Sequence, residues 1–214
     1  MARRLLVVHP EHKYDKILEA RDAIAGLLKE FNSGDVFVLF DDPDKTSEYL
    51  KSSAGLWLSS KSGEISEPDA KKIMDGCAEL TVVGNNFNDC HYDAFEAVSK
   101  QIISDTNIVL PTYASTEGIF CRLESDEIQR ICQAFERHRD RLEITYKFGQ
   151  PYPCLSTKEK VTLKEAQRYV AALTRREHSV DVYVDGRKVF DRQKGENKVA
   201  LLIRNKPPVD FRYG

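Results

Sequence analysis

The chain has 214 residues, of which 41% are hydrophobic and 31% charged, and its formal net charge is −2 at pH 7. These values are typical of a globular protein with one domain, or one domain with a small extension. The near-neutral charge disfavours a polyanionic partner, and no apolar run approaches the ~18 residues that a membrane-spanning helix needs. We therefore expect neither a nucleic acid nor a membrane as a partner.

The thiols indicate a reducing compartment. The cysteines number five and include no C-x-x-C pair, which disfavours both a disulfide framework and a zinc knuckle. The first apolar run, residues 5–8, ends at His9-Pro10 and is too short for the core of a signal peptide, so it predicts a strand. We expect a cytoplasmic protein with free thiols.

Strand and helix patterns alternate through residues 1–147. Apolar, β-branched runs predict parallel strands near residues 5–9, 36–40, 80–84 and 108–111, and periodic apolar positions predict helices over 17–31, 66–76, 89–103 and 124–142. Residues 44–66 break this alternation and predict a lid-like excursion with one short element, which contains Trp57. The fold class that follows is α/β: a three-layer, Rossmann-like, mostly parallel sheet with helices on both faces.

Residues 148–214 follow a Gly- and Pro-containing break and predict a small α+β extension. The patterns indicate a helix over 162–173, a hairpin with its turn at Asp185-Gly186, and a strand over 199–203. The extension either forms an appendage or continues the main sheet. Because a segment of roughly 60 residues is marginal alone, its apolar faces need the main domain or another subunit. We expect a homo-oligomer in which residues after about 150 contribute to the contact.

The strand predicted at 80–84 stops at Gly84, and a helix begins six residues later with Cys90 in its first turn. Unpaired N–H groups and the positive end of the dipole at a helix N-terminus stabilise a thiolate, which is the nucleophilic form of cysteine. The alternative is a buried cysteine that packs as a small hydrophobe.

This order of elements, with Gly84 and Cys90 six residues apart and the small residues Ala94 and Ala97 on the helix, resembles the isochorismatase-like cysteine hydrolases over residues 5–115. In that family the cysteine is the nucleophile, and a lysine precedes the helix before it. Lys61 has the corresponding place in the element order. The family ends its first strand with an aspartate that acts as general base, whereas this chain has His9.

The resemblance implies covalent hydrolysis of a small amide or related carbonyl compound, without a cofactor. Cys90 would attack, Lys61 would hold the thiolate, and His9 or Glu11 would replace the missing aspartate as proton shuttle. Backbone N–H groups of the turn before Cys90 would stabilise the oxyanion. The candidates for substrate binding are Asn86, Asn88, Trp57 and Tyr113. A non-catalytic descendant of the fold that binds a small ligand or a protein remains the alternative.

A second alternative uses the same turn. The run Asp89-Cys90-His91-Tyr92-Asp93 has a D-x-H-x-D pattern similar to a ligand run of arginase-type hydrolases, so Asp89, His91 and Asp93 are candidate ligands for Mn²⁺ or Zn²⁺. On a helix, however, Asp89 and Asp93 share a face from which His91 points away. Acidic residues at a helix start are also explained by the macrodipole alone.

Overall fold

The computed structural model describes much of the chain but not all of it. The described residues are 2–10, 17–41, 50, 53, 55–60, 63–85, 90–115, 143–145, 154–156, 160–162, 169, 172–173, 178–193 and 195–207. Side chains are described for these residues except 17–19, 143–145, 154–156 and 160–162.

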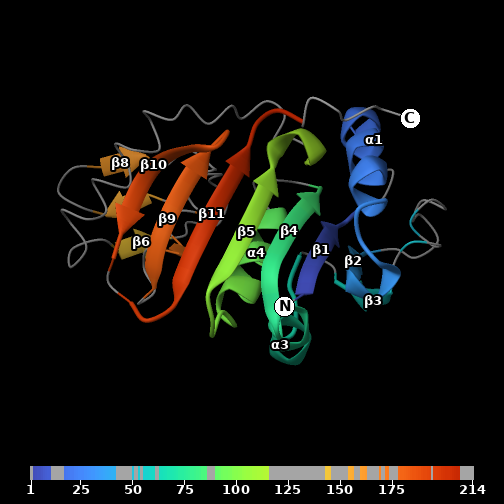
Figure 1. The fold of residues 1–214 in the computed structure, drawn as a ribbon, viewed down its shortest axis with the longest axis horizontal. Helices are drawn as coiled ribbons and strands as arrows, with labels where there is room; N and C mark the ends of the chain where they lie inside the picture. Colours follow the sequence, from blue (N-terminus) through green and yellow to red (C-terminus); the bar gives the residue numbers. More distant parts are fainter. Residues whose placement is uncertain are drawn as a thin grey trace.

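Eight strands of the described chain form one sheet in the order β10-β9-β11-β5-β4-β1-β2-β3 (Figure 1). Every neighbouring pair is parallel except β10 with β9. The predicted α/β class and its mostly parallel sheet are confirmed. The strands are β1 Ala2–Val8, β2 Val36–Phe40, β3 Leu56–Ser59, β4 Cys77–Gly84, β5 Thr106–Pro111, β9 Ser179–Val184, β10 Arg187–Arg192 and β11 Lys198–Arg204.

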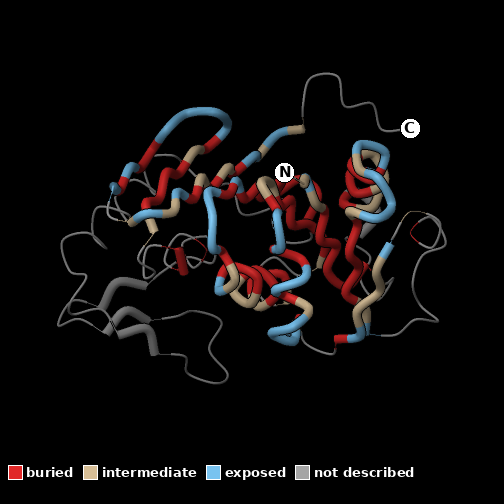
Figure 2. The backbone as a smooth tube through the Cα atoms, turned by 60° about the horizontal axis from the view of Figure 1, so that its bottom comes forward, coloured by how far each residue is buried: buried red, intermediate tan, exposed pale blue. Residues whose placement is uncertain are grey.

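Helices cover both faces of this sheet, as the sequence predicts. Ala23, Ile24 and Leu27 of α1 (Ile17–Leu28) pack on one face, against side chains of β1 and β2. The helices α3 (Glu67–Met74) and α4 (Cys90–Ser99) pack on the other face. Figure 2 shows the buried residues concentrated in the strands and in the sheet-facing sides of the helices.

The central strand β1 shows why an all-apolar run predicts a strand covered on both sides. Leu5 and Val7 belong to the cluster beneath α1, while Leu6 and Val8 belong to the cluster beneath α3 and α4. All four side chains are 0% exposed. Side chains alternate across a strand, so only a strand between two helical layers buries four consecutive residues.

The segment expected to be a lid-like excursion contributes a strand. Its residues 56–59 form β3, the edge of the parallel sheet beside β2. The helix predicted over 124–142 lies outside the described residues. The predicted helix start at Ser66 is confirmed, because the Ser66 side chain accepts a hydrogen bond from the backbone N–H of Asp69.

The late strands continue the main sheet. Asp185 and Gly186 have φ of 47° and 82°, as the predicted hairpin turn between β9 and β10 requires. The strand β11 lies between β5 and β9 and is parallel to both. The boundary expected between residues 147 and 148 falls outside the described residues and stays a prediction. Three short strands form a separate antiparallel sheet: β6 Glu143–Thr145, β7 Cys154–Ser156 and β8 Lys160–Thr162.

In the part of the chain that the structure describes, no helix combines the length and the apolar character needed to cross a membrane.

Candidate active site

The strand order reverses between β1 and β4. The chain passes from β1 to β2 and β3 on one side, and from β4 to β5 on the other. Ligands of open α/β sheets bind in the crevice outside the carboxyl ends of the strands at such a reversal. The described residues at this carboxyl edge include His9, Asp41, Ser60, Asn85 and Ser115.

His9, the candidate proton shuttle, is fixed at the end of β1 in an uncommon backbone conformation. Its φ is 42°, its side chain is buried, and its N–H donates to the Leu39 carbonyl oxygen over 2.9 Å. Its Nε2 lies 3.0 Å from the carbonyl oxygen of Ser60. A carbonyl only accepts, so Nε2 carries the proton in this hydrogen bond. In the neutral ring, the lone pair then lies on Nδ1.

Gly84 allows the backbones of β4 and β1 to meet at the crevice. Its φ is 117°, and a Cβ at this position would overlap the carbonyl oxygen of Val8. The next N–H, that of Asn85, donates to the same oxygen over 2.7 Å. The glycine that the sequence marks as the end of a strand is therefore required by close backbone approach.

A second glycine brings the segment after β3 against the candidate nucleophile. Gly63 has φ of 74°, and a Cβ there would overlap the backbone of Cys90. Three residues earlier, the Ser60 carbonyl accepts the hydrogen bond from His9. The segment between these two contacts contains Lys61, which lies outside the described residues. Three peptide links join Ser60 to Gly63, so the Cα atoms of these two residues are at most ~11 Å apart.

The two described cysteines differ in their surroundings. Cys90 is the first residue of α4 and is half-buried. Cys77 begins β4, where burial raises the pKa of its thiol to about 11, although the charge of Arg4 opposes this shift. Cys77 is therefore a thiol at neutral pH, and it serves as an internal reference for the reactivity of Cys90.

His91 points away from the crevice. It is 0% exposed; Nε2 lies 3.0 Å from the Val82 carbonyl oxygen, and Nδ1 lies 2.7 Å from the hydroxyl of Tyr169. The carbonyl only accepts, so Nε2 donates to it and Nδ1 accepts from Tyr169. Burial lowers the pKa of this histidine to about 4, against the opposing effect of its hydrogen bond to Val82.

The hydrogen bonds of His91 disfavour the alternative metal site. Both ring nitrogens of His91 are hydrogen-bonded within the protein, so neither can bind a metal ion without breaking a buried hydrogen bond. Asp93 is half-buried on α4, and Asp89 lies outside the described residues. Among the residues whose placement is described, no group of three or more His, Cys, Asp or Glu side chains is arranged to hold a metal.

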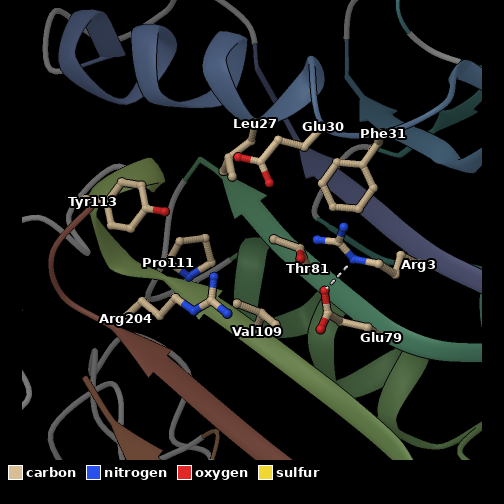
Figure 3. Close-up of a pocket in the computed structure, with 10 residues that line it drawn as sticks. All are labelled: Arg3, Leu27, Glu30, Phe31, Glu79, Thr81, Val109, Pro111, Tyr113 and Arg204. Atoms are coloured by element: carbon tan, nitrogen blue, oxygen red, sulfur yellow. Dashed lines mark hydrogen bonds and ion pairs between the residues drawn. The ribbon is translucent and has the colours of Figure 1, made fainter. Parts of the chain in front are cut away.

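The side chains of two predicted substrate-binding residues pack against other side chains of the fold. Trp57 is the second residue of β3 and packs against Phe40, with ring centroids 5.8 Å apart. Tyr113 is 7% exposed and belongs to the cluster beneath α1. Figure 3 shows Tyr113 at one end of a shallow depression that also holds Arg3 and Arg204. Asn86 and Asn88 lie outside the described residues.

Two serines at the carboxyl edge were not predicted. Ser60 follows β3, and Ser115 forms a parallel bridge with Gly84. They are 6% and 0% exposed, and among the described residues neither buried hydroxyl oxygen has a hydrogen-bond partner. A serine in sequence gives no signal of this kind, because the property depends on what surrounds its hydroxyl group.

Comparisons with known proteins give little further information. No family model matches the chain, and no curated protein matches it. A solved structure, that of MAR1 ribonuclease from Caenorhabditis elegans, is similar over 53% of this chain and 67% of the other, with 14% sequence identity and a TM-score of 0.39. A similarity at this level carries no argument about activity, so the function must be inferred from the residues themselves.

Proposed function

We propose that this chain is a cysteine-dependent hydrolase of a small amide or related carbonyl compound, with isochorismatase-like chemistry. The observation that supports it best is the pair of contacts made by Ser60 and Gly63. The Ser60 carbonyl accepts a hydrogen bond from His9, and Gly63 approaches the backbone of Cys90 closely. His9 and Cys90, in two of the proposed catalytic roles, are thus contacted by residues that lie three positions apart along the chain; Lys61, the third, lies between Ser60 and Gly63 in sequence and outside the described residues.

In the first step, His9 accepts the Cys90 thiol proton at Nδ1, because its Nε2 donates to Ser60. The Cys90 thiolate then attacks the carbonyl carbon of the substrate, and a C–S bond forms. His9 delivers the proton to the leaving nitrogen as the C–N bond breaks. The Lys61 ammonium holds the thiolate, and N–H groups at the start of α4 stabilise the oxyanion.

In the second step, water hydrolyses the thioester. His9 takes a proton from the water, which attacks the acyl carbon, and the C–S bond breaks. The products are the carboxylic acid and the amine, and the thiolate returns. This cycle needs no cofactor or oxidant. It requires Cys90 to remain reduced, so the proposal includes a reducing, cytoplasmic compartment.

The test measures the alkylation rate of each cysteine by iodoacetamide, itself a small amide, with peptide mass spectrometry as a function of pH. We expect Cys90 to react with a midpoint well below the ~8.5 of an ordinary thiol, and Cys77 to remain unreactive. Lys61→Met and His9→Asn should each raise the Cys90 midpoint. Asparagine suits position 9, because it tolerates positive φ and has no titrating nitrogen.

The matched controls are Lys72→Met, an exposed lysine on α3, and His178→Asn, which precedes β9. Neither should move the midpoint. Turnover is measured as ammonia release from small primary amides, which Cys90→Ser should abolish. An ordinary midpoint for Cys90 would remove the basis for catalysis. Protection of Cys90 by an amide that is never hydrolysed would favour the non-catalytic, ligand-binding descendant instead.

A further inference from the structure

The residue behind the candidate nucleophile ties the start of α4 to a distant part of the chain. His91 follows Cys90 directly, and its ring is fully buried. Nε2 of this ring donates to the Val82 carbonyl oxygen over 3.0 Å, and Nδ1 accepts from the Tyr169 hydroxyl over 2.7 Å. One side chain therefore connects the first turn of α4 to β4 and to a residue 78 positions further along the chain.

Tyr169 belongs to the segment over which the sequence predicts a helix, residues 162–173. The residues of this segment with described side chains, Tyr169, Ala172 and Leu173, are helical and buried. Their spacing of three and four positions places them on one face of a helix, and all three belong to the same core cluster as the buried apolar residues of α4. Residues after the expected boundary at 147 therefore contribute to the core around α4.

The ring of Tyr169 lies against three aromatic side chains of α4. Its centroid is 5.7 Å from that of His91, 5.3 Å from that of Tyr92 and 4.8 Å from that of Phe95. The first two contacts are edge-to-face, a favourable arrangement of aromatic rings. A ring that is enclosed in this way in a close-packed core has little freedom to change its rotamer. The Tyr169 hydroxyl is thus held opposite His91 Nδ1.

The chemistry proposed for Cys90 requires the first turn of α4 to stay wound. The N–H groups and the dipole at this end of the helix stabilise the thiolate and the oxyanion, and their effect is confined to the first turn. The N–H groups that follow Cys90 belong to His91 and Tyr92, which both lie against Tyr169. Helix ends fray when nothing anchors them. The two hydrogen bonds of the His91 ring supply such an anchor at the second residue of α4.

We propose that Tyr169 is a positioning residue for Cys90 and that it acts through His91, an inference that rests on the proposed function. The Tyr169 hydroxyl holds the imidazole, and the imidazole holds the first turn of α4 against β4. The wound turn keeps its N–H groups directed at the thiolate of Cys90. The part of the chain after residue 147 then completes the catalytic unit instead of forming an independent extension.

This role can be distinguished from an effect of charge. Burial lowers the pKa of His91 to about 4, so its ring is neutral between about pH 5 and pH 9, where the alkylation of a cysteine is measured. Replacing His91 with an uncharged residue removes no charge in this range. A change in the titration midpoint of Cys90 therefore reports a change in the helix start.

The experiment measures the midpoint of Cys90 alkylation by iodoacetamide in full-length variants whose fold is verified by circular dichroism. Tyr169→Phe removes only the hydroxyl, and His91→Leu removes both hydrogen bonds. Each should raise the midpoint by about one pH unit, a tenfold loss of thiol acidity, which is the size of a helix-end effect. His91→Gln can keep both hydrogen bonds and should leave the midpoint near that of the wild type. In the His91→Leu background, Tyr169→Phe should raise it no further, because the hydroxyl acts through the imidazole.

The matched control is Ser99→Ala at the other end of the same helix, where the buried Ser99 hydroxyl donates to the Glu96 carbonyl oxygen over 2.9 Å. It should leave the midpoint unchanged. Hydrogen exchange of residues 90–95 gives a second readout that does not use the thiol. Exchange should be faster in Tyr169→Phe than in the wild type and in Ser99→Ala.

The two readouts allow the positioning role and the hydrolase to fail separately. A low wild-type midpoint that Tyr169→Phe leaves unchanged overturns the positioning role and leaves the hydrolase standing. An ordinary wild-type midpoint removes the hydrolase, and hydrogen exchange then decides the anchoring alone: equal exchange in Tyr169→Phe and the wild type overturns it. An equal effect of Ser99→Ala on either readout also overturns it, because the effect is then one of general destabilisation.

Discussion

His91 should make this protein less stable as the pH falls from about 6.5 to 4, a range that begins above the one in which carboxylates titrate. Burial lowers its pKa from 6.5 to about 4 in the folded state. The unfolded chain binds a proton near pH 6.5, but the folded chain does not until about pH 4, so stability is lost as pH falls between these values. The full shift corresponds to about 3 kcal/mol, of which about 2 kcal/mol is lost between pH 7 and pH 5.

The assay is urea denaturation at 25 °C and at a series of pH values, with the wild type compared to His91→Gln. Glutamine can still donate to Val82 and accept from Tyr169 but does not titrate, so the difference in slope isolates the histidine. Tyr169→Phe supplies a second check: it removes the buried hydrogen bond to His91 Nδ1 and should lower the free energy of unfolding by about 1–3 kcal/mol at pH 7. Equal changes in stability between pH 7 and pH 5 in wild type and His91→Gln would refute the reasoning.

Two further sets of substitutions separate effects that look alike in sequence. Thermal unfolding should show almost no effect for Gly34→Ala, where a Cβ meets nothing within 4 Å, and a loss of about 1 kcal/mol for Gly76→Ala, which has positive φ in open space. Gly84→Ala combines positive φ with backbone overlap and should lower the free energy of unfolding by ~3 kcal/mol or more. Equal losses at all three positions would show that the close approach of the backbones at Gly84 is unimportant. Ser115→Ala should leave stability unchanged or raise it, because its hydroxyl has no hydrogen-bond partner among the residues that the structure describes. Thr112→Val should lower the free energy of unfolding by about 1 kcal/mol, because the Thr112 hydroxyl donates to the Arg204 carbonyl at the end of β11. Urea denaturation measures both, and a loss at position 115 as large as that at 112 contradicts this account.

The strands and helices that the sequence predicted best are those whose burial forms a local pattern. The run Leu5–Val8 is apolar on both sides, and the Asp185-Gly186 pair specifies its turn, so both elements could be placed from sequence. For the segment of β3 the sequence predicted one short element but not that it is a strand of the main sheet. The strand lies at the sheet edge, where three of its residues are half-buried and Ser59 is exposed, so its sequence is short and mixed. The position of β11 between β5 and β9 depends on long-range pairing and leaves no local signal.

The candidate site was predictable where a backbone requirement determines the residue type. Gly84 follows from such a requirement, because its position lies against the backbone of Val8. Cys90 is the first residue of α4, at the helix start that the sequence predicted. The role of Gly63 could not be predicted, because its contact is with a residue 27 positions further along the chain. His91 was a plausible ligand in sequence, and only its two buried hydrogen bonds identify it as a core residue.

The place of β11 has a consequence for how this protein is made. β9 and β10 precede β11 in the chain, but in the sheet as far as the structure describes it, β9 joins the remaining strands through β11. During synthesis, the hairpin of β9 and β10 therefore emerges before the strand that joins it to β5. Until residues 198–204 are made, β5 and β9 each expose an unpaired edge with apolar neighbours, and such edges favour aggregation. A nascent chain halted before residue 198 should be a substrate for chaperones, whereas one released after 204 can close the sheet in a single step.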